Sequence, residues 1–168
     1  ALLNKEGFLT VVVTNQPVIA RGELTFKELN TIHAKMEKLL SLKGAYLDEI
    51  TFCPHHPDSG FENEIKELKT KCICRKPNNG LIEQSMQKLN ITNQSSWMIG
   101  DRTADILAGQ KSFLNTILLR TGFYGKDQKY SVQPDFIMDD LYNASQFIIR
   151  YQNLETKIFN LVKKRLHL

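Results

Sequence analysis

All three cysteines of the chain, together with one histidine, are arranged in two tight pairs. Cys53 and His55 have Cys-x-His spacing, and Cys72 and Cys74 have Cys-x-Cys spacing. Three sulfur donors and one imidazole nitrogen suit a tetrahedral structural zinc site, which keeps no open position for catalysis. The spacing therefore predicts a zinc ion that clamps the two ends of the polar loop between the pairs. His56 is a rival ligand to His55, and the sequence does not separate the two.

Two other interpretations of these side chains are plain reduced thiols and a disulfide. Scattered cysteines rarely fall into two such close pairs, which favours metal binding over plain thiols. A disulfide would leave one of the three cysteines unpaired. No signal peptide is visible, so the cytoplasm, where thiols stay reduced, is the expected compartment.

Two cations, Arg75 and Lys76, directly follow the last of these cysteines. A metal bound at Cys74 would fix the backbone beside them. We therefore interpret the metal as the part that aims these two cations at a phosphate group.

Further polar residues occur where apolar runs end. The run Phe8–Val13 is followed by Thr14 and Asn15, and the run Trp97–Gly100 is followed by Asp101. Ligands of open α/β sheets bind at the carboxyl ends of the strands, where a hydroxyl can hold phosphate and a carboxylate can bind magnesium. The alternatives are ordinary turn residues after the first run and a helix N-cap after the second.

Apolar runs and amphipathic stretches alternate along the chain. Strands are predicted at 8–13, 46–52, 97–100, 115–120 and 135–138, and helices follow Thr25, Gly80, Asp101 and about Leu141. This alternation predicts a mainly parallel, doubly wound α/β sheet, and the first run reads as a strand that is buried on both faces. Thr25 and Glu28 form a capping box. Asp105 is expected to support the site rather than to bind the ion.

The bulk composition is that of one globular domain. The chain has 168 residues, 42% of them hydrophobic and 24% charged, with a net charge of +4. No dense basic stripe with interleaved aromatics argues for nucleic acid, and no apolar run reaches the length of a membrane span.

We expect a domain at 1–150 and an amphipathic C-terminal helix at 151–168, with Leu154, Ile158, Leu161, Val162 and Leu166 on one face. The protein is expected to be a monomer, or a weak oligomer through this helix.

The chain resembles the haloacid-dehalogenase (HAD) type phosphatases that remove the 7-phosphate from D-glycero-D-manno-heptose 1,7-bisphosphate. The resemblance covers about residues 1–140. It is carried, in this order, by Thr14-Asn15-Gln16, Ile19-Ala20-Arg21-Gly22, Cys53-Pro54-His55-His56-Pro57, Cys72-x-Cys74-Arg75-Lys76-Pro77 and Ile99-Gly100-Asp101. The related histidinol-phosphate phosphatases share most of this pattern and are the alternative.

This resemblance implies a HAD-like fold and a mechanism in which an aspartate attacks the phosphate, with magnesium between nucleophile and phosphate and a small phosphorylated sugar as substrate. The roles that it implies are phosphoryl binding by Thr14 and Asn15, charge neutralisation by Lys76, magnesium binding by Asp101, and substrate contacts by Gln16, Arg21, Arg75 and Arg102.

The chain departs from the family pattern in three places. Pro17-Val18 replaces Ser-Gly, and Asn78-Asn79 replaces His-Pro. The third departure is that no Asp-x-Asp pair occurs in the 168 residues. That pair, on the first strand of the family, supplies the nucleophile and the general acid. We therefore expect a piece of a longer polypeptide that lacks the first strand and has no turnover alone. A catalytically inactive, zinc-stabilised module that binds sugar phosphates is the remaining alternative.

Overall fold

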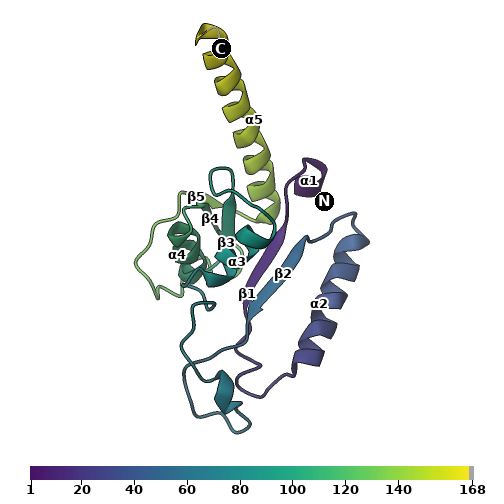
Figure 1. Cartoon of the computed structure of the whole chain (residues 1–168), viewed down its shortest axis with the longest axis vertical. Helices are drawn as coiled ribbons and strands as arrows, with labels where there is room; N and C mark the ends of the chain where they lie inside the picture. The colour runs from purple at the N-terminus through teal and green to yellow at the C-terminus, as the bar shows by residue number, and fades with distance from the viewer. Residues whose placement is uncertain (167–168) are drawn as a thin grey trace.

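Strands and helices alternate along most of the chain, up to β4, which is followed directly by β5 (Figure 1); this computed structural model describes residues 1–166. The strands are β1 (Val11–Asn15), β2 (Glu49–Cys53), β3 (Trp97–Gly100), β4 (Asn115–Leu119) and β5 (Phe136–Met138). The helices are α1 (Leu2–Lys5), α2 (Phe26–Ser41), α3 (Gly80–Lys88), α4 (Thr103–Lys111) and α5 (Leu141–Leu166), with a short 3-10 helix, η1 (Lys66–Leu68). All strand pairs are parallel, which confirms the predicted α/β class.

The described strands form two sheets rather than one. β1 pairs with β2, and β3, β4 and β5 form a second sheet in that order. No hydrogen-bonded ladder joins β1 to β3 in this part of the chain. The two sheets are instead connected by packing, because Val13 of β1 contacts the buried cluster of Ile82, Met98 and Ala108 from α3, β3 and α4.

The prediction that the first strand is buried on both faces was wrong. β1 begins at Val11 rather than Phe8, and all five of its residues are only half-buried. The physical reason is that β2 is its one hydrogen-bonded neighbour among the described strands, so a second strand does not cover its other edge.

α2 begins as the sequence predicted. Thr25 accepts a hydrogen bond from the Glu28 backbone N–H, and the Glu28 carboxylate accepts one from the Thr25 N–H, so the capping box is complete. Leu29 is buried, and the His33 ring lies edge-on to Phe52 of β2 with centroids 5.6 Å apart. His33 therefore has a packing contact with β2.

A second core holds the base of α5 against the three-stranded sheet. Ile117 of β4 and Ala144 and Ile148 of α5 are buried together. Trp97 and Phe147 meet edge to face beside them, with ring centroids 5.9 Å apart. This core fixes β3, whose carboxyl end carries Asp101.

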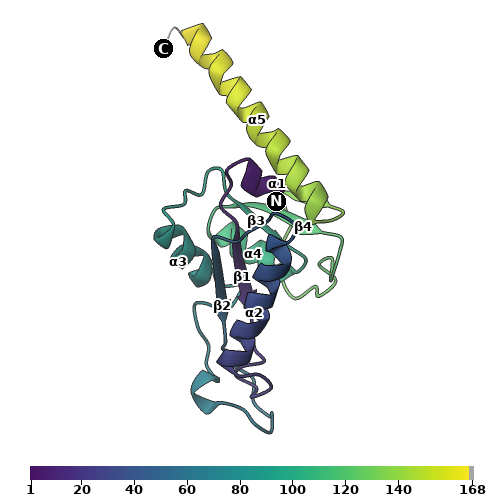
Figure 2. The same cartoon turned by 90° about the vertical axis from the view of Figure 1, so that its right-hand side faces the viewer.

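α5 is one continuous helix that extends well beyond the body of the protein (Figure 2). The helix predicted from about Leu141 and the amphipathic C-terminal helix are therefore the same element; the division at residue 150 remains a prediction. Leu154, Ile158 and Leu161 are exposed on its projecting part. The side chains of Val162, Lys164, Arg165 and Leu166 lie outside the described residues. None of the helices described combines the length and apolar composition that a membrane crossing requires.

Candidate active site and metal centre

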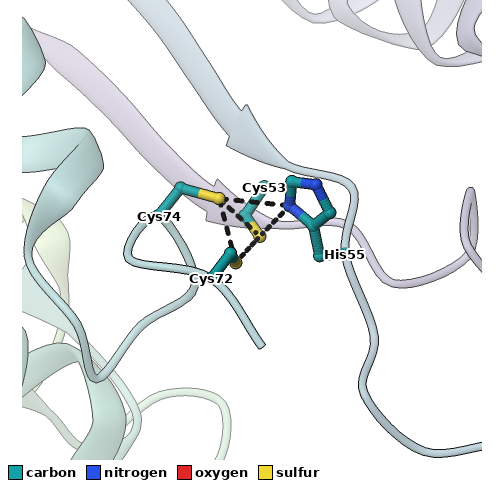
Figure 3. Close-up of side chains that lie close together, drawn as sticks. All are labelled: Cys53, His55, Cys72 and Cys74. Carbon is teal, nitrogen blue, oxygen red and sulfur yellow. Dashed lines mark hydrogen bonds between the residues drawn. The ribbon is translucent and has the colours of Figure 1, made fainter. Parts of the chain in front are cut away.

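The four predicted zinc ligands meet at one point. Figure 3 shows their side chains converging from the end of β2 and from the loop before α3. The sulfur of Cys74 lies 3.2 Å from that of Cys53 and 3.1 Å from that of Cys72. The Nδ1 atom of His55 lies 3.2 Å from the Cys74 sulfur. All four donor atoms fall within 4.8 Å of one another, and this is the one such group of His, Cys, Asp or Glu donors in the described part of the chain.

This donor set fits zinc in kind and in size. A tetrahedral ion with zinc–sulfur bonds of about 2.3 Å has sulfur–sulfur edges of about 3.8 Å. The observed edges, 3.1 to 3.5 Å, are only slightly shorter. Three sulfurs and one nitrogen leave no open position on the ion, so the site would be structural.

The electrostatics of the cluster also call for a cation. Burial raises the pKa of the Cys53 thiol, and a hydrogen bond with Cys74 raises it further. Burial likewise raises the pKa of Cys74. Burial opposes ionisation at Cys72 too, but hydrogen bonds from Cys74 and Cys53 outweigh it and lower the pKa of Cys72. Three thiolates cannot share this volume by themselves, and a divalent ion supplies the missing positive charge.

His55, and not His56, belongs to the cluster. The Nδ1 atom of His56 lies 3.2 Å from the carbonyl oxygen of Asp58, and its ring packs edge-on against Phe61 at 5.5 Å. The structure thus separates two neighbouring histidines that the sequence left as rivals.

The metal-binding loop is packed against the segment that follows β1. The Ile65 N–H donates to the carbonyl of Ala20 at 2.9 Å, and the Ala20 N–H donates to that of Pro54. Gly22 has a φ of +71°, and a Cβ there would collide with the backbone of Asn63. A side chain at residue 22 would therefore push the loop away from the end of β1.

Lys76 is held by three groups at the sheet edge. Its ammonium donates to the carbonyl oxygen of Val13 at 2.6 Å and forms an ion pair with Asp105 at 2.7 Å. Asn15 clamps its backbone: the Asn15 amide accepts from the Lys76 N–H and donates to the Lys76 carbonyl, both at 3.0 Å. Asn15 also lies opposite Cys53 in the parallel register. The metal cluster and the lysine are therefore fixed to the same two strand ends.

A cavity of about 620 Å³ opens at this edge. Of the residues predicted to form the site, it is lined by Thr14, Asn15, Arg75, Lys76, Asp101 and Arg102. These residues come from β1, the loop after the last zinc ligand and the β3–α4 junction. The structure thus brings together the three separate parts that the sequence predicted to meet.

Gln16 and Arg21 do not line this cavity. The Gln16 amide donates to the Thr14 hydroxyl at 3.2 Å. The Arg21 guanidinium lies over the Phe61 ring at 5.3 Å and pairs with Glu23 at 2.9 Å. Both side chains therefore support neighbouring residues in this structure, and their predicted substrate contacts stay predictions.

The two carboxylates at the start of α4 differ in their surroundings. Asp101 lines the cavity and accepts one hydrogen bond from the Phe123 N–H at 2.8 Å. Asp105 is buried, accepts from the Arg102 N–H at 3.1 Å and pairs with Lys76. Both carboxylates line the cavity, but that of Asp105 is already paired with the Lys76 ammonium. Asp101 has no such partner cation among the described residues, which suits a hard cation such as magnesium.

The cavity also has lining residues that the sequence did not indicate: Lys71, Asp127, Lys129 and Tyr130. Asp127 accepts hydrogen bonds from the Thr103 N–H at 3.0 Å and from its hydroxyl at 2.7 Å. These two bonds tie the β4–β5 loop to the first turn of α4. Gly122 and Gly125 have positive φ angles, as is typical of a turned loop, but no motif in the sequence indicates that this loop faces the site.

The family model described as HAD-hydrolase-like matches residues 73–144. D-glycero-beta-D-manno-heptose-1,7-bisphosphate 7-phosphatase of Yersinia pestis is 40% identical over 121 residues, which are 71% of this chain and 62% of that protein. The enzyme of the same name from Escherichia coli K12 is 38% identical, over 71% of this chain and 61% of that protein. The chain thus spans about 62% of the length of such relatives.

A solved structure shares the fold. The D,D-heptose 1,7-bisphosphate phosphatase of B. bronchiseptica, complexed with magnesium and phosphate, has a TM-score of 0.74 and 27% identity. The match covers 89% of this chain and 78% of that one. The chain is therefore similar, in its sequence and in its parallel α/β fold, to the HAD-like hydrolases and to these phosphatases.

Proposed function

We propose that the protein is a magnesium-dependent phosphatase that removes the 7-phosphate from D-glycero-D-manno-heptose 1,7-bisphosphate. The observation that carries this proposal is the shared cavity, in which Lys76, Thr14 and Asp101 meet at the carboxyl ends of β1 and β3. The names of the similar enzymes supply the substrate.

In this proposal each group has one task. The Thr14 hydroxyl, oriented by Gln16, donates to a phosphoryl oxygen. The Lys76 ammonium, held by Asp105, neutralises negative charge that builds up on that group. Arg75 binds other anionic or hydroxyl groups of the substrate, and Arg102 lies beside them at the cavity wall.

Asp101 would hold the magnesium ion, which when bound supplies positive charge to the phosphate. Asn15 acts through Lys76, because both of its amide groups are bonded to the lysine backbone. It is therefore proposed as a positioning residue rather than as a phosphate ligand.

In this proposal the metal cluster has a structural role. Zinc at Cys53, His55, Cys72 and Cys74 would fix the backbone two residues before Lys76. Thiolate ligands need a reducing compartment, which supports the cytoplasm as the location. The exposed apolar residues of α5 support a weak self-association through that helix.

The test is phosphate release from heptose 1,7-bisphosphate and from histidinol phosphate by the longest natural form of the protein, with magnesium present. The proposal expects release from the heptose bisphosphate and little from histidinol phosphate. Preference for histidinol phosphate would assign the alternative substrate. Binding of the bisphosphate with no release would instead support a sugar-phosphate binding module.

A further inference from the structure

The part of α5 that extends past Tyr151 is not covered by any other element in the described part of the chain. Tyr151 still packs against Trp97, with ring centroids 5.2 Å apart. Beyond it, every residue from 153 to 161, and also Lys163, is exposed. Figures 1 and 2 show this stretch leaving the body of the protein at the end opposite the metal-binding loop. A large surface can therefore approach the stretch without meeting the cavity.

Large apolar side chains are exposed on this stretch. Leu154, Ile158, Phe159 and Leu161 are 52 to 63% exposed. At about 100° of rotation per residue, these four positions occupy an arc of about 160° around the helix. A helix that pairs with one other helix uses a narrower seam. Such a wide arc suits a flat apolar boundary, such as the interface of a lipid bilayer.

Lysines flank this apolar arc on both sides. By the same rotation Lys157 lies about 40° beyond Leu161, and Lys163 lies about 40° beyond Phe159. The Lys163 ammonium lies over the Phe159 ring, 5.2 Å from its centroid. Lysines at the borders of such an arc can extend their ammonium groups to lipid headgroups while their methylene stems stay on the apolar side.

The charge of the stretch selects the kind of surface. The sequence from 151 to 166 has four lysines or arginines, at 157, 163, 164 and 165, and one acid, Glu155. A second copy of the chain would bring the same positive excess to the contact, which opposes strong self-association. An anionic lipid surface attracts these cations instead, and each one raises the affinity about fivefold.

We propose that the projecting part of α5, residues 153–166, binds the surface of a bilayer that contains anionic phospholipids. The apolar arc faces the acyl chains, and the flanking lysines contact the headgroups. The cavity lies at the opposite end of the protein and stays open to solvent. This inference is independent of the proposed substrate, since it uses no residue of the cavity.

The test is co-sedimentation of the chain with vesicles of phosphatidylcholine, pure or mixed with phosphatidylglycerol. Binding to the mixed vesicles should be at least about tenfold tighter. Lys157→Gln with Lys163→Gln should weaken it about tenfold or more, because two headgroup contacts are lost. The matched control is Lys35→Gln with Lys38→Gln, which removes two exposed lysines of α2 and should leave binding unchanged.

Two further variants separate the apolar and the charged contributions. Ile158→Gln with Leu161→Gln removes half of the apolar arc and should also weaken binding at least about tenfold. Glu155→Gln removes the one acid of the stretch and should strengthen binding to the mixed vesicles about fivefold. Circular dichroism of each variant should match that of the unaltered chain, because these side chains are exposed.

Binding that requires phosphatidylglycerol, and that falls in the α5 lysine variant but not in the α2 control, supports the proposal. Equal binding to both kinds of vesicle, equal losses in the two lysine variants, or no binding at all overturns it. Sedimentation equilibrium without vesicles examines the other occupant. A dimer that Ile158→Gln with Leu161→Gln dissociates, in a chain that binds no vesicles, would assign the apolar arc to a second copy and overturn the proposal.

Discussion

The metal-binding segment 53–77 and the β3–β4–β5 half of the protein are stabilised in different ways. Segment 53–77 contains one 3-10 helix, and Cys53 is its one fully buried residue. The other half is built on regular strands and helices around fully buried side chains such as Ile117 and Ile106. Burial of apolar side chains can stabilise the β3–β4–β5 half. Segment 53–77 has little such burial and must depend on metal ligation and on isolated hydrogen bonds.

Loss of zinc should have the largest effect, and it should be confined to one region. His55→Gln, or Cys72→Ser with Cys74→Ser, should remove the bound zinc, because a structural site needs all of its ligands. Amide hydrogen exchange should then rise to nearly unprotected rates in 54–71 while β3, β4 and β5 stay protected. His56→Gln is the control and should keep one zinc per chain, as measured by metal analysis.

If both histidine variants lose zinc, the ligand assignment is wrong. If exchange rises equally in β4, the two regions do not differ in the way described.

Shortening a buried side chain should lower stability in the β3–β4–β5 half, whereas shortening an apolar side chain of segment 53–77 should have little effect on stability. Ile117 is fully buried, so Ile117→Ala should lower the free energy of unfolding by about 2 to 5 kcal/mol. Ile73 lies between two zinc ligands but is 80% exposed, and Ile73→Ala should change stability by less than about 0.5 kcal/mol. Urea denaturation of both variants measures the difference. Similar losses in the two would show that residue 73 packs in solution.

Removal of the Lys76 ammonium should lower turnover rather than stability. Lys76→Ala should lower turnover by roughly a hundredfold or more, since each bond to a charged transition state in such a site contributes a few kcal/mol. Turnover is measured on the longest natural form of the protein, with exposed Lys35→Ala as the control. Unchanged turnover in Lys76→Ala would remove this lysine from the site.

Asn15 should have a smaller effect that links the two regions. Asn15→Ala deletes both bonds to the Lys76 backbone and should weaken phosphate binding about tenfold. Asn15→Asp keeps the acceptor for the Lys76 N–H, so its affinity for phosphate should lie between the affinities of the unaltered chain and of Asn15→Ala. Calorimetry with inorganic phosphate measures this series. Equal phosphate affinity in all three proteins would show that the clamp does not position the lysine.

Much of this arrangement could be predicted from the sequence because it rests on local signals. Strand 97–100 was predicted to the residue, since a short apolar run ends at a polar turn. The zinc ligands were found because their spacing is short. α5 was predicted in two parts, although no glycine or proline interrupts 141–166, which is the signal that it is one helix.

The remainder depends on contacts between distant residues. Asn15 and Lys76 are 61 positions apart. Nothing near Asn15 in the sequence therefore indicates that its side-chain amide is hydrogen-bonded to the backbone of Lys76. The same holds for Asp127, whose partner Thr103 lies 24 positions away. The half-buried state of β1 could not be predicted either, because it depends on which strands become its neighbours.

The central claim is that zinc in the loop positions Lys76 for an anion in the cavity. The most direct test is the affinity of the chain for inorganic phosphate, measured by calorimetry with zinc bound and after zinc is removed by a chelator. We predict a dissociation constant at least about tenfold lower for the zinc-loaded chain, restored when zinc is added back. Equal affinity of the two forms, with the β3–β4–β5 half folded in both, would contradict the claim.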